Sequence, residues 1–118
     1  MAGRLTTHVL DTANGKPAAG MEIRLWSVAP SGARRLLKAL VTNQDGRTDT
    51  PLIIEGELKK GLYELVFSVG DYFRDQPDLP AVPFLDQVPV RFGISDESAH
   101  YHVPLLVSPW AYSTYRGS

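Results

Sequence analysis

Hydrophobic and polar residues alternate along most of the chain with a period of two, which is typical of half-buried β-strands. Turn-forming residues separate the alternating segments at intervals of about ten residues. Pro89 lacks an amide donor, so its segment is predicted to be an edge strand or to begin at a bulge. The Leu-Leu-Lys-Ala-Leu run at 36–40 fits a short helix as well as a strand. The predicted strands are residues 4–11, 21–28, 35–42, 62–69, 88–94 and two more between 100 and 117.

The last two predicted strands form a hairpin that folds back at Ser108-Pro109. Side chains two residues apart share one face of a strand, so Val103 and its like-parity neighbours Leu105 and Val107 form the core face. His102 then lies on the opposite face, where a site could be built. The residues of the returning strand that could join it there are Ser113, Tyr115 and Gly117.

One short helix is predicted near residues 71–76, with Asp71 close to its N-cap and Pro77 at its end. Seven or eight short strands and this helical turn together predict an all-β sandwich. A chain of 118 residues is too short for two independent cores, so residues 1–118 are expected to form one domain.

The charge and composition of the chain restrict its partners. Twelve basic and 13 acidic residues leave a net charge of −1 without a basic cluster, so neither a nucleic acid nor a membrane is predicted as a partner. The chain has no cysteine, which excludes a thiol nucleophile and a thiolate metal site. No apolar run approaches the roughly 20 residues that span a bilayer, and the first residues do not resemble a signal peptide. We therefore expect a cytoplasmic location.

The candidate chemical groups are ambiguous when they are read one at a time. The position of His8 is compatible with an ordinary exposed histidine on a strand. Arg47 follows the Asp-Gly turn and is compatible with an ordinary solvated arginine in a loop. His100 and His102 share a strand face, as zinc ligands sometimes do. No acidic residue lies on the strand face that His100 and His102 share, and His8 is distant in sequence. Metal binding is therefore the weaker alternative, and His100 is interpreted as a structural or exposed residue.

Three motifs in order resemble one known family. They are the segment from Leu5 to Asp11, the segment from Asp45 to Thr48, and the tail Tyr115-Arg116-Gly117-Ser118. Together they are similar to the transthyretin-related 5-hydroxyisourate hydrolases over essentially the whole chain. The terminal tetrapeptide separates these enzymes from transthyretin, the hormone carrier of the same fold. The resemblance implies a transthyretin-like β-sandwich of two four-stranded sheets with one short helix.

The resemblance also implies an activity and an assembly. The expected reaction is ring opening of 5-hydroxyisourate, a product of urate oxidation, to 2-oxo-4-hydroxy-4-carboxy-5-ureidoimidazoline, without a metal or cofactor. The expected assembly is a homotetramer, a dimer of dimers whose central channel contains the sites. The resemblance assigns catalytic roles to His8, Arg47 and His102, and substrate contacts to Tyr115, Arg116, Gly117 and Ser118.

The hydrolysis of a cyclic amide requires a base for water, a group that stabilises an oxyanion, and a proton for the leaving nitrogen. His8 and His102 can divide the proton transfers in either order, and Arg47 would stabilise the oxyanion. The alternative function is a non-catalytic carrier of a small hydrophobic ligand. Such a carrier needs an apolar channel, whereas His8, Arg47, His102 and Tyr115 would make the channel polar.

Overall fold

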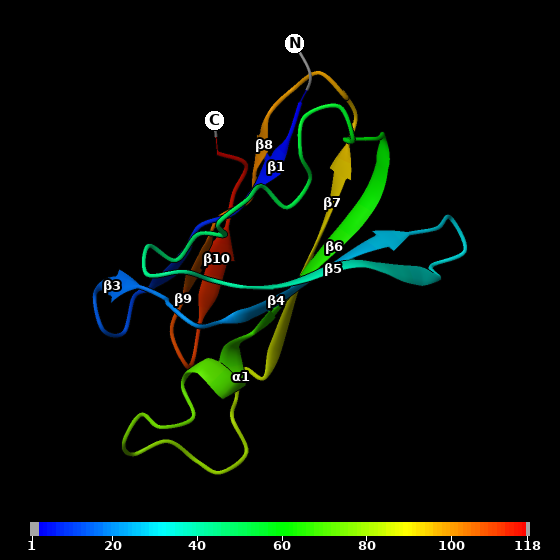
Figure 1. The fold of residues 1–118 in the computed structure, drawn as a ribbon. Helices are drawn as coiled ribbons and strands as arrows, with labels where there is room; N and C mark the ends of the chain where they lie inside the picture. The colour runs from blue at the N-terminus through cyan, green and yellow to red at the C-terminus, as the bar shows by residue number, and fades with distance from the viewer. Residues whose placement is uncertain (1–2, 118) are drawn as a thin grey trace.

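The computed structural model describes residues 3–117, which form a β-sandwich with overall dimensions of 46 × 31 × 21 Å (Figure 1). One sheet is antiparallel, with the strand order β5-β4-β6-β7. The ambiguous segment at 35–42 is a strand, and the segment containing Pro89 is an edge strand, as its missing amide predicts. The strands are β4 (Glu22–Val28), β5 (Arg34–Val41), β6 (Gly61–Ser68) and β7 (Gln87–Ile94).

The second sheet has the order β10-β9-β2-β3, and β1 and β8, which precede β2 and β9 in the chain, form a separate two-stranded sheet. In this layer the N-terminal and C-terminal segments of the described chain run parallel, with Val9 opposite Leu105 and Thr6 opposite His102. The predicted strand at 4–11 is divided into β1 and β2. The strands are β1 (Leu5–Thr6), β2 (Val9–Asp11), β3 (Lys16–Pro17), β8 (Tyr101–His102), β9 (Leu105–Val107) and β10 (Tyr112–Thr114).

The hydrophobic core lies between the two sheets and fixes which way β1, β2 and β9 face. Leu5, Val9, Leu105 and Val107 are fully buried there. A buried aliphatic side chain stabilises the fold by about 1.5–3 kcal/mol, and a slip of one residue would turn all four out of the core. His102 in β8 lies between the buried residues Tyr101 and Val103 and is held on the outward face, as the alternation predicts.

The helix is present but its bounds differ from the prediction. Helix α1 (Val69–Tyr72) begins directly after β6, two residues earlier than expected, at the end of the sandwich opposite β1 and β8 (Figure 1). Asp71 lies inside the first turn, and the N-cap residue Ser68 makes no side-chain cap bond. The burial of Val69 in the core fixes the start of the helix, so interpreting Asp71 as a capping signal gave the wrong position.

Candidate active site

The parallel pairing of β1 with β8 brings Thr6 beside His102, although 96 residues separate them. The hydroxyl oxygen of Thr6 is 2.8 Å from Nδ1 of His102 and 2.9 Å from Nε2 of His100. One hydroxyl therefore bridges two histidine rings on the outward face of the sheet. The pairing of Thr6 with either ring was not predicted from the sequence.

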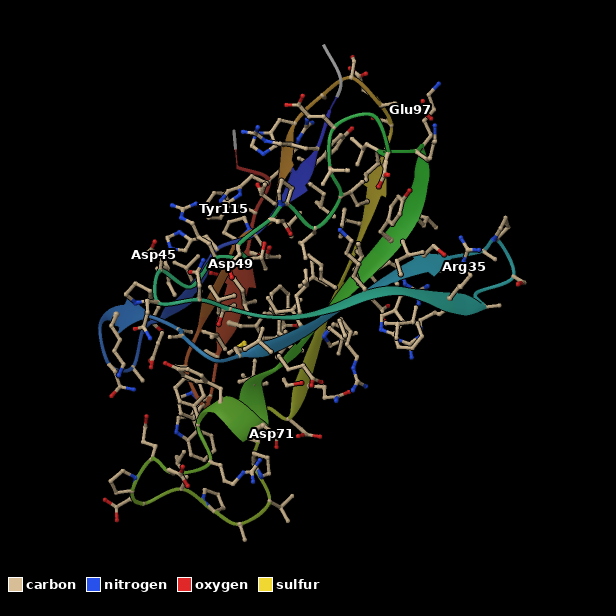
Figure 2. The ribbon with its side chains drawn as sticks, viewed as in Figure 1. Arg35, Asp45, Asp49, Asp71, Glu97 and Tyr115 are labelled. Atoms are coloured by element: carbon tan, nitrogen blue, oxygen red, sulfur yellow. The ribbon has the colours of Figure 1, made fainter. Side chains whose placement is uncertain are left out.

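A polar cleft of about 480 Å³ adjoins this hydroxyl bridge. One wall comes from β1 and β8, and the other comes from the segment that carries Arg47, which Asp45 and Asp49 mark in Figure 2. The structure therefore brings His102 and Arg47 to one cleft. The lining residues are Arg4, Thr6, Thr7, Arg47, Thr48, Asp49, Thr50, Pro51, His100 and His102.

The position of Arg47 is set by the tight turn that precedes it. The side-chain oxygen of Asn43 accepts hydrogen bonds from the amides of Asp45 and Arg47, at 2.9 and 3.2 Å. Gly46 has a φ of 75°, and a Cβ there would lie 2.3 Å from the carbonyl oxygen of Val9. The turn can approach β2 this closely only with glycine at this position, and the positive φ agrees with the predicted Asp-Gly turn.

His8 lies beside the cleft and is not part of its lining. Its Nε2 is 2.8 Å from the carbonyl oxygen of Asp45. A carbonyl oxygen only accepts hydrogen bonds, so Nε2 carries a hydrogen. The backbone between β1 and β2 thus holds His8 against the turn that presents Arg47, and three candidate catalytic groups are gathered at one end of the sheet.

The surroundings of His102 favour its neutral form. Burial lowers the pKa of His102, and the nearby charges of Arg47, His100 and His8 lower it further. Burial, assisted by the charge of Arg4, also lowers the pKa of His100. Neutral imidazole can accept a proton, so His102 is suited to act as a base near neutral pH.

The C-terminal tail reaches the site through Gly117. Its amide donates a hydrogen bond of 2.8 Å to the carbonyl oxygen of His102. A Cβ at this position would lie 2.7 Å from Cδ2 of His102, so a larger residue would displace the imidazole ring. Glycine therefore allows the tail to pack directly against the ring.

The other predicted tail residues are not part of this cleft. Tyr115 is 60% exposed, and its position beyond β10 is labelled in Figure 2. The guanidinium of Arg116 lies 4.2 Å from the centre of the Tyr101 ring and lines a different pocket. Ser118 lies outside the described residues. One chain therefore brings Gly117 to His102 and leaves Tyr115 and Arg116 away from the cleft.

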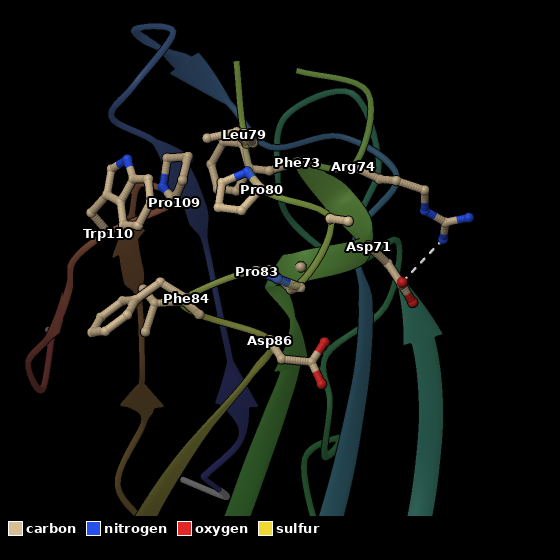
Figure 3. Close-up of a pocket in the computed structure, with 13 residues that line it drawn as sticks. Asp71, Phe73, Arg74, Leu79, Pro80, Pro83, Phe84, Asp86, Pro109 and Trp110 are labelled. Atoms are coloured by element: carbon tan, nitrogen blue, oxygen red, sulfur yellow. Dashed lines mark hydrogen bonds and ion pairs between the residues drawn. The ribbon is translucent and has the colours of Figure 1, made fainter. Parts of the chain in front are cut away.

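Two other cavities offer different chemistry. A cavity of about 270 Å³ lies between α1, the proline-rich loop and the β9–β10 turn, where Phe84 faces Trp110 and Asp71 pairs with Arg74 (Figure 3). The second, of about 540 Å³, contains Asp11 and Tyr72. Burial and the hydrogen bond to Asp11 raise the pKa of Tyr72 to about 12. The described lining of both cavities contains no histidine.

Within residues 3–117, no group of three or more histidine, cysteine or acidic side chains is placed so that it could hold a metal ion. In the same part of the chain, no helix has the length and hydrophobicity needed to cross a membrane.

Residues 5–117 match the HIUase/Transthyretin family, and the chain belongs to this family. It is 57% identical to the 5-hydroxyisourate hydrolase of Halalkalibacterium halodurans over the full length of both chains. Among solved structures it is similar to an (S)-allantoin synthase, with a TM-score of 0.92 and 49% identity over 99% of this chain but only 44% of that one. It is also similar to sea bream transthyretin in complex with thyroxine, with a TM-score of 0.85 and 27% identity over 97% and 94% of the two chains. The transthyretin-like sandwich expected from the sequence is confirmed.

Proposed function

We propose that the chain hydrolyses 5-hydroxyisourate at an amide bond of its six-membered ring, and that the cleft beside His102 is the active site. The activity is supported by the family and by the full-length relative named for it. The main observation that supports the position of the site is that His102, whose pKa is lowered, and Arg47 line the same polar cleft.

In this proposal His102 is the general base. Its Nδ1 is held by Thr6, and its Nε2 makes no hydrogen bond within residues 3–117. Nε2 can therefore take a proton from water as the oxygen attacks the ring carbonyl, because the lowered pKa keeps the ring neutral beforehand.

Arg47 stabilises the negative charge that develops on the carbonyl oxygen. Its guanidinium is always charged and presents parallel donors that match an oxyanion or the carboxylate of the product. The turn at Gly46 fixes its backbone before substrate arrives, so little reorganisation is needed.

His8 is the proton donor to the leaving nitrogen. In its protonated form the ring keeps the Nε2–H bond to the Asp45 carbonyl and offers a second N–H from Nδ1. This division assigns the two histidines different tasks, which the sequence alone left open.

The active assembly is proposed to be a homotetramer formed from two dimers. His8 and His102 are only half-buried in one chain, and Tyr115, which lies away from the cleft, is 60% exposed. Packing a second copy against the face that carries the two histidines would exclude water from the cleft and bring Tyr115 and the tail closer to a bound substrate. Light scattering measures the mass of the assembly directly, and a monomer with full activity would contradict this part of the proposal. A cytoplasmic location stays a prediction.

The activity is tested by adding the protein to freshly formed 5-hydroxyisourate and following the loss of its absorbance. We expect decay well above the spontaneous rate, with the ring-opened carboxylate as product. Decay at the spontaneous rate would contradict the proposal. The polar lining of the cleft disfavours a carrier of apolar ligands, and saturable binding of such a ligand without turnover would support the carrier.

A further inference from the structure

The hydroxyl group of Thr6 connects two histidine rings that do not touch. The ring centres of His100 and His102 are 6.3 Å apart, and the Thr6 oxygen lies within 2.9 Å of a nitrogen of each. All three side chains are half-buried and line the cleft. The two rings can therefore affect each other through this one oxygen atom.

The number of hydrogens limits how the three groups can bond. A hydroxyl has one hydrogen to donate, and a neutral imidazole carries one hydrogen on one of its two nitrogens. Thr6 can donate to one ring only, and it must accept an N–H from the other ring for both bonds to form. If it donates to His102, the hydrogen of that ring is on Nε2. If it donates to His100, the hydrogen of His102 is on Nδ1.

Only the second arrangement leaves Nε2 of His102 with a free lone pair. When water is deprotonated there, one O–H bond breaks and one N–H bond forms at Nε2. The new imidazolium keeps its Nδ1–H bond to Thr6, whose own hydrogen already points to His100. No heavy atom has to move, so the charge forms in a site that is already oriented for it.

We propose that Thr6 and His100 are positioning residues for the reaction: His100 accepts the hydrogen of Thr6 and thereby holds His102 in the tautomer with a free Nε2. This inference rests on the proposed function, in which His102 is the base. Neither Thr6 nor His100 exchanges a proton with the substrate in this scheme.

His100 must be neutral to fill this role, because a protonated ring has no acceptor nitrogen. Burial and the charge of Arg4 both disfavour protonation of His100. If His100 were protonated, its Nε2–H would donate to Thr6, and Thr6 would donate to His102 and block the base. A neutral His100 is thus consistent with the proposed arrangement.

The decisive experiment reads the tautomer of His102 directly. Imidazole ¹⁵N chemical shifts are recorded on the resting protein at about pH 8, where rings with a reference pKa near 6.5 or below are neutral. We expect Nδ1–H in the native chain. In His100→Phe, Thr6 loses its alternative acceptor and donates to His102, so the hydrogen of His102 should move to Nε2. A tautomer that is the same in both proteins would overturn the inference.

Kinetics provide a second measurement. Thr6→Val keeps the shape of the side chain and removes the hydroxyl, so kcat should fall by about 10–100-fold with little change in KM, as for a lost orienting bond. Thr6→Ser should restore most of the rate. An unchanged kcat in both Thr6→Val and His100→Phe would also overturn the proposal. If Thr6→Val does not fold, Thr6→Ser and His100→Phe still decide it.

Thr12→Val is the matched control. Thr12 also donates a hydroxyl hydrogen bond between the N-terminal and C-terminal strands, to the carbonyl of Val107 at 3.1 Å, but it is remote from the histidines. Its loss should leave the His102 tautomer unchanged and alter kcat by less than about threefold. The tautomer measurement needs no substrate, so it is independent of the proposed function. If the native protein is inactive but the His102 hydrogen still moves in His100→Phe, the proposed function is contradicted and the hydrogen-bond linkage stands.

Discussion

The two outward faces each carry a cluster of polar groups, and the clusters differ in how completely their groups are paired. On the sheet formed by β5, β4, β6 and β7, the Glu64 carboxylate accepts hydrogen bonds from Arg34 at 2.7 Å and from Arg91 at 3.1 Å. The guanidinium of Arg34 also lies 4.4 Å from the centre of the Trp26 ring. The charged groups of this cluster bind one another across all four strands.

The cluster around His102 retains bonding capacity. Within residues 3–117, Arg47 makes no ion pair and Nε2 of His102 makes no hydrogen bond. Groups that are already paired hold the fold together, whereas groups with unused donors or acceptors can bind a substrate. The comparison indicates that the remaining bonding capacity of polar groups, and not their number, distinguishes the proposed active-site face from the structural one.

The largest expected effect comes from removing His102, the proposed base. His102→Asn keeps a polar side chain of similar size and loses the titratable ring, so kcat should fall by about 10²–10⁴-fold. Circular dichroism and thermal melting check that the fold is retained. A loss of less than about tenfold, some 1.4 kcal/mol, would remove His102 from the role of base.

Displacing the proposed base without changing it should have a smaller effect. Gly117→Ala places a methyl group where a Cβ would be 2.7 Å from the His102 ring, so the ring must shift. We expect kcat to fall by about 10–100-fold, because misplacement of a reacting group by about 1 Å can cost that much. Gly93→Ala is the control, because its nearest contact would be an ordinary 3.7 Å. Equal rates in the two variants would show that the tail does not position His102.

The pH dependence should follow the lowered pKa of His102. The neutral form of His102 is favoured by burial and by the charges of Arg47, His100 and His8. As the pH is lowered, kcat/KM should therefore fall to half its maximum at a pH below the reference pKa of about 6.5. The unfolded chain binds more protons than the folded one in this range, so the free energy of unfolding should also decrease as the pH falls below about 6.5. Rate and unfolding measurements across this range test both expectations; a midpoint above the reference value would argue against His102.

The smallest effect on activity is expected from the paired cluster. Glu64→Gln weakens the charge-assisted bonds to Arg34 and Arg91, which should lower the free energy of unfolding by about 1–2 kcal/mol. The rate should change by less than about twofold, since the cluster is on the other sheet. Urea denaturation and the ring-opening assay measure the two quantities on the same sample. A large loss of rate at unchanged stability would contradict the distinction drawn between the two faces.

Local patterns predicted much of this molecule. The alternation at 103–107 correctly placed His102 outside the core, and the turn at Ser108-Pro109 gave the hairpin. The same parity put Gly117 on the face of His102, and the structure places Gly117 against that ring. These features depend on neighbouring residues alone, which is why one sequence is enough to find them.

Features that depend on distant contacts were missed or needed the family resemblance. The helix bounds were wrong because core burial of Val69 outweighed the capping signal at Asp71. The contact of Thr6 with two histidines depends on a parallel register between distant segments, which no local pattern specifies. His100 was therefore interpreted only as a structural or exposed residue. The gathering of His8 and Arg47 at one end of the sheet was expected only from the resemblance.

The pairing of β1 with β8 also determines when the site can form during synthesis. Thr6 and His102 are 96 residues apart, and translation at about 5–20 residues per second separates their appearance by roughly 5–20 s. The hairpins of β4 with β5 and of β2 with β3 need only nearby residues and can form first, whereas β1 must wait for β8 and the other edge of β2 must wait for β9. Until then β1 and the edge of β2 that pairs with β9 have no partner strand, so the nascent chain carries an exposed, pairing-competent segment that a chaperone could bind.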